Sequence, residues 1–148
     1  MSESIYQKYF LTEPELRNVS LNKGIVAPSA YIDSEKHFHS SANFSMAWRY
    51  ITRPLLMDQT PHAHPFDQFL CFLGGNLENM FDFDADVELS LGEEHEKHVI
   101  TKSTVVFIPK GRLHCPLSFV RIGKPVLFHP IALTAAYYSK FAENRRNK

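Results

Sequence analysis

The chain has no net charge and no long apolar run. Its 148 residues include 16 basic and 16 acidic side chains, so nothing global favours a polyanion or an anionic lipid surface as a partner. No apolar run is long enough to span a bilayer. The segment Met1–Ser4 lacks the basic and apolar regions of a signal peptide. We therefore expect a cytoplasmic protein that binds neither nucleic acid nor a membrane.

Cysteine is also scarce. Cys71 and Cys115 are the only two, and each lies within an apolar stretch. Two cysteines in a protein without export signals are typical of reduced, buried thiols rather than of a disulfide. Cys115 directly follows His114, so in a regular strand the two side chains would point to opposite faces.

The main pattern in the chain is a series of short segments typical of β-strands. Alternating or β-branched apolar residues recur between turn signals such as Gly74-Gly75 and Gly92. At this length the chain forms one domain with a real hydrophobic core. Short strands of this number predict an all-β sandwich or barrel. The predicted strands cover residues 43–51, 69–73, 87–91, 98–100, 105–108, 117–120 and 126–128.

The two ends of the chain are less regular. Residues 1–43 are predicted to form an N-terminal arm or extra strands, with a short helix starting at Thr12 because an acidic first turn follows this cap. Residues 133–148 are predicted to be a C-terminal tail that contains a short closing helix over 134–141. The barrel itself is therefore assigned to residues 44–132.

Two short segments contain the residues that suggest chemistry. His62 and His64 are one residue apart, so on a strand both imidazoles point to the same side. Gln68 follows shortly after, and His114 lies far downstream. Three imidazoles and an amide can form a four-ligand site for one divalent transition metal ion.

These segments resemble the two conserved motifs of the cupin superfamily. The first motif has the form His-x-His, then Glu, then Gly, and matches His62, His64, Gln68 and Gly74 or Gly75; the second has the form Pro-x-Gly-x-x-His and matches Pro109, Gly111 and His114. The resemblance covers about residues 44–132. It implies a double-stranded β-helix, which is a small jelly-roll barrel, with the metal inside its open end. Cupins are commonly dimers, so the resemblance also implies a homodimer.

Gln68 departs from the cupin pattern, in which this position is usually Glu. A Gln offers a neutral carbonyl oxygen, so a metal held by it and three neutral imidazoles keeps its full divalent charge. Zn, Ni, Fe and Mn all remain possible ions. The leading hypothesis is an enzyme that uses the metal as a Lewis acid, in an isomerase, lyase or cyclase reaction on an oxygenated small molecule such as a sugar derivative. The alternatives are a metal-dependent dioxygenase and a non-catalytic module that binds or senses a small molecule.

Substrate contacts are predicted from position and polarity. Pocket residues in cupins often precede the first motif, and aromatic side chains can line an apolar mouth. Arg49 lies on the strand face opposite Trp48 and Tyr50, so these three side chains cannot all face the metal. The candidate residues are Arg49, Tyr50, Arg53, Phe66, Phe72 and Phe128.

Other histidine and acidic clusters have simpler interpretations. His37-Phe38-His39 is expected in a surface loop or a leading edge strand. The acidic segment from Asp82 to Asp86 resembles an EF-hand loop, but Val87 replaces the required glycine and strands flank it, so an acidic loop is expected. His95 and His98 are expected in a solvated hairpin. His129 is interpreted as a strand end or as a neighbour of the metal ligands.

Overall fold

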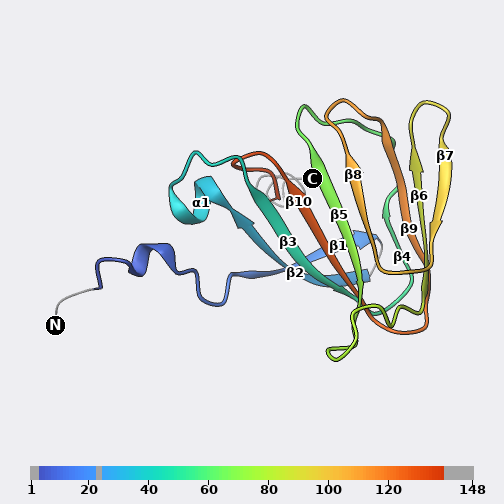
Figure 1. The fold of residues 1–148 in the computed structure, drawn as a ribbon, viewed down its shortest axis with the longest axis horizontal. Helices are drawn as coiled ribbons and strands as arrows, with labels where there is room; N and C mark the ends of the chain where they lie inside the picture. Colours follow the sequence, from blue (N-terminus) through green and yellow to red (C-terminus); the bar gives the residue numbers. More distant parts are fainter. Residues whose placement is uncertain (1–3, 23–24, 139–148) are drawn as a thin grey trace.

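Two antiparallel sheets face each other and form an open barrel (Figure 1). The computed structural model describes residues 4–22 and 25–138. The elements in chain order are η1 (Gln7–Tyr9), β1 (Leu16–Asn22), β2 (Ile25–Asp33), α1 (Ser34–Phe38), β3 (Ser45–Ile51), β4 (Leu55–Asp58), β5 (Gln68–Gly74), β6 (Ala85–Leu91), β7 (Glu96–Ile100), β8 (Thr104–Ile108), β9 (His114–Ile122) and β10 (Val126–Ala132). The expected all-β jelly-roll class is therefore confirmed.

The two sheets differ in size. The larger has the strand order β1-β2-β3-β10-β5-β8, and the smaller has the order β4-β9-β6-β7. Every strand that sequence periodicity predicts is present, as β3 and β5 to β10. The pairing of β10 with both β3 and β5 brings residues far apart in the sequence side by side, so the substrate candidate Arg49 lies opposite Phe128.

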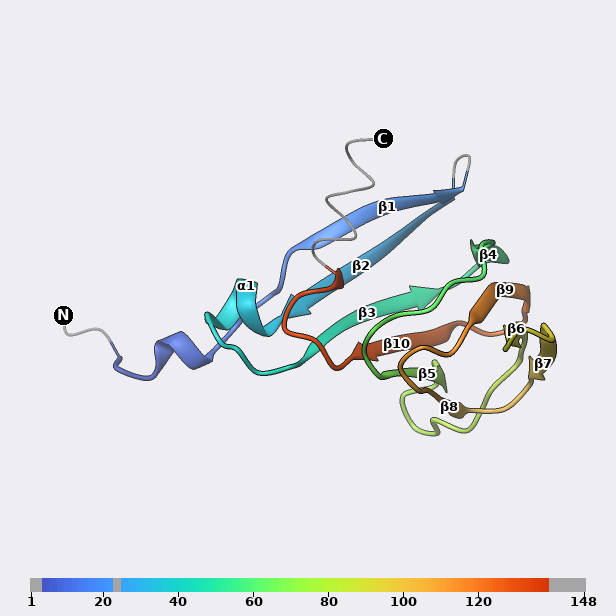
Figure 2. The same ribbon diagram turned by 90° about the horizontal axis from the view of Figure 1, so that it is seen from above.

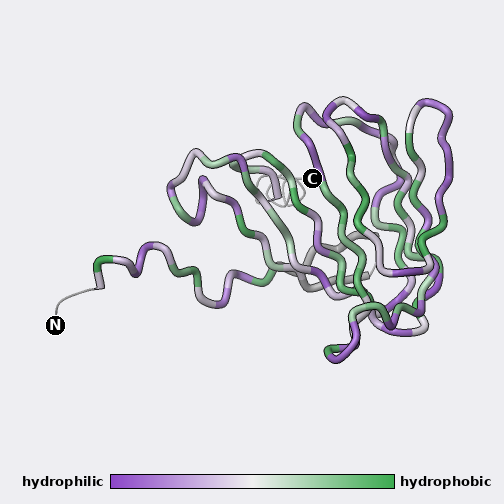
Figure 3. Tube along the Cα trace, in the orientation of Figure 1, coloured by the Kyte–Doolittle hydropathy of each residue, from purple (hydrophilic) through white to green (hydrophobic). Residues whose placement is uncertain are grey.

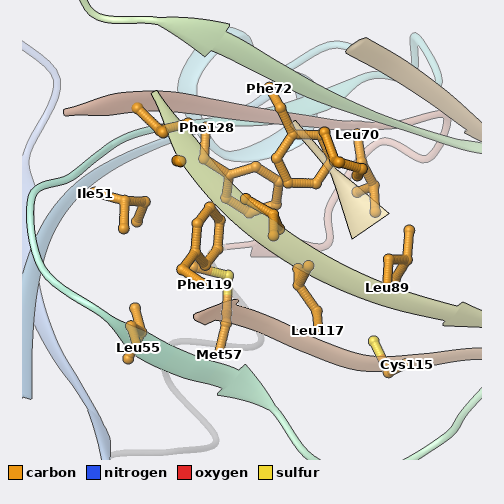
Figure 4. Close-up of a cluster of buried hydrophobic side chains, with 14 of the residues drawn as sticks. Ile51, Leu55, Met57, Leu70, Phe72, Leu89, Cys115, Leu117, Phe119 and Phe128 are labelled. Carbon is orange, nitrogen blue, oxygen red and sulfur yellow. The ribbon is translucent and has the colours of Figure 1, made fainter. Parts of the chain in front are cut away.

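The hydrophobic core fills the space between the sheets. Alternate residues of β3, β5, β9 and β10 are buried, and Figure 3 shows hydrophobic residues concentrated along the strands. At the centre, Phe72 lies 5.0 Å from Phe128 and 6.0 Å from Phe119 between ring centroids, as Figure 4 shows. These three side chains are 2% exposed or less, and full burial of one such side chain contributes about 1.5–3 kcal/mol.

The N-terminal region, for which an arm or extra strands were expected, contains two strands whose bounds the periodicity of the sequence did not predict. β2 pairs with β3, and β1 pairs with β2, so they extend the larger sheet beyond the barrel (Figure 2). The helix predicted from Thr12 is wrong. Glu13 adopts a left-handed conformation (φ 49°) immediately before Pro14, and a residue that precedes proline is disfavoured in the α conformation. Among the described residues that precede β1, the one helical turn is η1.

The expectation for His37 and His39 is also wrong. Residues 34–38 form the short helix α1, and His39 ends it in a left-handed conformation. The Asp33 amide donates a hydrogen bond to Nδ1 of His37 at 2.8 Å. Neither histidine belongs to the groups of described residues whose side chains could share a metal ion.

The acidic segment is a loop that leads into β6, as expected. Its charges are paired: Lys124 Nζ lies 2.8 Å from Asp82, and Arg121 lies 2.8 Å from both Asp84 and Asp86. Arg121 and Lys124 therefore offset the charge of this acidic segment locally. His98 lies in the β7 hairpin, half exposed and paired with Glu96.

At the C-terminal end, residues 134–137 are not helical, and the rest of the predicted closing helix from 139 onward lies outside the described residues. None of the described helices has both the length and the hydropathy needed to cross a membrane.

Candidate metal centre

Three histidines converge at one end of the barrel. His62 and His64 lie between β4 and β5, and His114 begins β9. His62 and His114 form an isolated antiparallel bridge, in which each backbone amide donates to the other's carbonyl at 3.0 and 2.9 Å. The ligand atoms of the three imidazoles lie within 4.8 Å of one another. The structure thus brings together all three histidines that the sequence analysis singled out.

Backbone carbonyls orient two of the rings. Nδ1 of His62 lies 2.8 Å from the carbonyl oxygen of Thr60, and Nδ1 of His114 lies 3.0 Å from that of Arg112. A carbonyl only accepts, so each Nδ1 carries the proton and each Nε2 keeps its lone pair. Asp58 adds a carboxylate 3.7 Å from Nδ1 of His62. Contacts of this kind fix the tautomer of histidines that bind metals.

Burial favours the neutral form of two of the rings, those of His64 and His114. It lowers the pKa of His64 from 6.5 to about 4, and the nearby His62 and His114 lower that pKa further. Burial likewise lowers the pKa of His114. Because only a neutral imidazole offers a lone pair to a metal, His64 and His114 can bind one at neutral pH without losing a proton.

Gln68, the first residue of β5, is the fourth predicted ligand. The side chain is 5% exposed, and Nε2 donates to the hydroxyl of Tyr138 at 3.1 Å. Oε1 is buried and has no hydrogen-bond partner. A buried carbonyl oxygen without a partner is costly, and a metal ion is one way to satisfy it. The donor set of three imidazoles and one amide oxygen therefore fits a divalent transition metal.

A cavity of about 70 Å³ lies beside these side chains. Its lining combines the predicted ligands with apolar walls. The lining residues are Arg49, Met57, Asp58, His62, His64, Gln68, Leu70, His114, Cys115, Leu117, Phe128, Pro130, Tyr137 and Tyr138.

The six substrate candidates divide into three groups. Arg49 and Phe128 line the cavity. Phe66 lies beside it, with its ring stacked on that of His64 at 4.9 Å and 7°. The other three are corrected: Tyr50 is 64% exposed on the opposite face of β3, Arg53 is exposed after that strand ends, and Phe72 is enclosed in the core at 0% exposure.

Two tyrosines after β10 belong to the site but were missed. The hydroxyl of Tyr137 lies 3.2 Å from Nε2 of His64, and that of Tyr138 accepts the hydrogen bond from Gln68. Tyr138 is 4% exposed, and burial raises its pKa above its usual range. In the sequence, these residues stand out only as two adjacent tyrosines, and no spacing rule links them to the histidine motifs.

Cys115 corrects a further expectation. Its side chain does not point away from the site but lines the same cavity as His114. The alternation of faces fails because Cys115 has a φ of 83°, so both residues are buried at the start of β9. Burial raises the pKa of the Cys115 thiol to about 12. Both cysteines are free.

His129, by contrast, lies on the outer face of β10, where it pairs with Cys71 in β5. It does not line the cavity. Its interpretation as a strand residue away from the ligands is therefore the better of the two.

Solved structures with the same architecture are numerous. Oxalate decarboxylase from Bacillus subtilis, studied for its Mn(II) centres, superposes with a TM-score of 0.55 at 10% identity over 85% of this chain and 29% of that one. The fold is that of the cupins. KdgF from Halomonas sp. superposes with a TM-score of 0.53 at 12% identity, over 86% of this chain and 92% of that one. FeII HppE superposes with a TM-score of 0.53 at 9% identity, over 81% of this chain and 56% of that one. This chain thus spans less than a third of the oxalate decarboxylase and most of KdgF.

Sequence comparison adds nothing to this cupin fold. No family model matches the chain, and no curated protein matches it. At identities of 9–12% the structural likeness establishes the fold alone. The chemistry has to be argued from the residues of this chain itself.

Proposed function

We propose that this cupin is an enzyme that uses one divalent transition metal as a Lewis acid on a small oxygenated molecule. The proposed reaction is of the isomerase, lyase or cyclase type. The single observation that carries the proposal is the buried, unpartnered Oε1 of Gln68 beside three clustered histidines. When bound, the metal would polarise a carbonyl or hydroxyl oxygen of the ligand.

The chain's own residues have separate roles in this proposal. His62, His64, Gln68 and His114 hold the ion, and none of them contributes a negative charge. Tyr138 fixes the amide of Gln68 so that its nitrogen faces the phenol and its oxygen remains available. The apolar walls around Phe128 exclude water from the ligand.

Metal content tests the site directly. We expect protein purified without added metal, or reconstituted with Zn, Ni, Fe or Mn, to contain about one ion per chain by elemental analysis. His62→Ala should lose that ion, whereas His98→Ala should retain it, because His98 is a half-exposed histidine on β7 outside the cluster. Wild-type protein that stays metal-free after reconstitution would remove the basis of the proposal.

Gln68→Glu tests the Lewis-acid role. A carboxylate at this position neutralises part of the metal charge, so we expect metal affinity to stay equal or rise while turnover falls by about tenfold or more. Unchanged turnover in Gln68→Glu would contradict the charge argument. Oxygen uptake during turnover would favour the alternative of a dioxygenase, and metal and ligand binding without turnover would favour a binding or sensing module.

For the whole molecule we propose a cytoplasmic homodimer. Free cysteines support a reducing compartment. The outer face that β3, β10, β5 and β8 share has no Asp, Glu, Lys or Arg, which supports self-association.

A further inference from the structure

Arg49 is a buried cation that faces the same cavity as the histidines. It lies on the inner face of β3, is 5% exposed, and is the register partner of Phe128 on β10. Arg53, just beyond the end of this strand, is exposed to solvent, in contrast to Arg49. The guanidinium of Arg49 therefore needs a compensating interaction inside the barrel.

The contacts of Arg49 do not supply a counter-charge. Nη1 lies 3.4 Å from Sδ of Met57, and Nη2 lies 3.4 Å from the hydroxyl of Tyr31. The guanidinium carbon lies 5.6 Å from the centroid of the Tyr31 ring. Nε is buried and has no hydrogen-bond partner. None of the ion pairs between described residues involves Arg49.

Neutral acceptors at these distances are weak compensation for a charge. A thioether sulfur is a poor acceptor, and a guanidinium has five N–H donors in a planar fork. Removing such a cation from water without an anion costs several kcal/mol. A carboxylate matches the fork in shape and charge and accepts two parallel hydrogen bonds.

We propose that Arg49 is the carboxylate-binding residue of this cavity, and that the ligand is a small carboxylic acid with a hydroxyl or carbonyl oxygen near the carboxylate. The second half of this statement rests on the proposed function, because that oxygen is the one the histidine site would take. The cavity of about 70 Å³ has room for a few heavy atoms. Arg49 is the one arginine or lysine among its lining residues, and the one carboxylate there, Asp58, lies beside Nδ1 of His62 at 3.7 Å.

The test uses metal-stripped protein, so that its outcome does not depend on the metal hypothesis. Calorimetric titration compares acetate and glycolate with their neutral counterparts, acetamide and glycolamide. We expect the carboxylates to bind at least about tenfold more tightly than the amides, since charged hydrogen bonds of this kind contribute about 1.5–3 kcal/mol. Equal affinities, or tighter binding of inorganic phosphate than of either carboxylate, would overturn the proposal.

Variants locate the binding. Arg49→Met should weaken glycolate binding by about tenfold or more, and Arg49→Lys should restore only part of it, because an ammonium lacks the planar fork. Arg53→Met is the matched control and should bind glycolate as wild type does. If Arg49→Met does not fold, the ¹⁵N–¹H signal of the Arg49 Nε, assigned by its loss in Arg49→Lys, should shift on addition of glycolate and not of glycolamide. An unshifted signal would overturn the proposal.

The two proposals can fail independently. Loss of the carboxylate preference in metal-free protein refutes the role of Arg49 while His62 and its neighbours can still bind metal. Conversely, glycolate binding that depends on Arg49 in a protein that never takes up metal would refute the proposed function and leave the anion site in place.

Discussion

A neutral imidazole at position 64 makes the stability of the metal-free protein depend on pH. The folded-state pKa of His64 is about 4, below its ordinary value of 6.5, so between these values the unfolded chain binds more protons than the folded one. Stability is therefore fully present above pH 6.5 and falls as the pH drops toward 4. Solvent screens the partly exposed ring, so we expect the free energy of unfolding to fall by about 1 kcal/mol between pH 7 and pH 5. Urea unfolding of metal-free protein at the two pH values measures this.

The matched controls are His64→Asn and His98→Ala. The first removes the buried imidazole and should flatten the pH dependence, although His114, whose pKa is also lowered, leaves a remainder. The second removes a half-exposed histidine and should change nothing. A slope that is the same in wild type and His64→Asn would show that another group is responsible.

The sequence pointed to the four side chains that the fold brings to one cavity, but not to their surroundings. His62, His64, Gln68 and His114 could be predicted because their spacing is local within each motif. Tyr137 and Tyr138 reach the site only through the path of the chain after β10, which no local pattern encodes. Cys115 was misplaced because the rule of alternating faces assumes a regular strand, and its φ of 83° breaks that rule.

The loop between β8 and β9 positions two ligands through one glycine. The Gly111 amide donates to the carbonyl of His64 at 2.8 Å, three residues before His114. Gly111 has a φ of 79°, and a Cβ added there would meet nothing within 4 Å, so the cost of a side chain is conformational rather than steric. Gly111→Ala should therefore lower the free energy of unfolding by about 1–2 kcal/mol and weaken metal binding.

Gly111→Asn is the informative comparison for that prediction. Asparagine is larger than alanine but tolerates the left-handed conformation better. We therefore expect Gly111→Asn to lower the free energy of unfolding less than Gly111→Ala does. Thermal unfolding and metal titration measure both variants. A loss in Gly111→Asn that equals or exceeds the loss in Gly111→Ala would show that backbone conformation is not the cause.

Periodicity predicted seven strands, and the three missed ones have identifiable reasons. β4 follows Pro54 and has only four residues, and a strand of this length is too short for an alternation to be recognised. β2 contains Pro28, which lowers the expectation of a strand even though proline is tolerated in some pairings. β1 exists through its pairing with β2. Strand formation in this region thus depends on partners rather than on local preference.

Only the assembled sheet shows which side chains share its outer face. Phe69 and Phe107 are far apart in the sequence, yet they are register partners with ring centroids 5.1 Å apart. Across the four adjacent strands β3, β10, β5 and β8, this outer face has no Asp, Glu, Lys or Arg. Its residues are Met46, Trp48, Tyr50, Phe69, Cys71, Leu73, Val105, Phe107, Leu127, His129 and Ile131.

We propose a second copy of this chain as the occupant of that outer face. Trp48, Val105 and Phe107 are 44%, 59% and 52% exposed. A two-fold dimer brings the same patch of both copies together, and a patch without charges can face itself without like-charge repulsion. We therefore expect a homodimer by light scattering coupled to size exclusion, and we expect Phe107→Lys to shift it toward the monomer, with at least a tenfold weaker association.

Val99→Lys is the matched control for Phe107→Lys. Val99 is 56% exposed on β7 of the smaller sheet, where it pairs with Glu88 in a charged surrounding. Val99→Lys introduces the same charge at a similar exposure but on a strand of the other sheet, so the dimer should persist. A wild-type monomer at micromolar concentration would refute the interface. Dissociation by Val99→Lys but not by Phe107→Lys would instead place the contact on the smaller sheet.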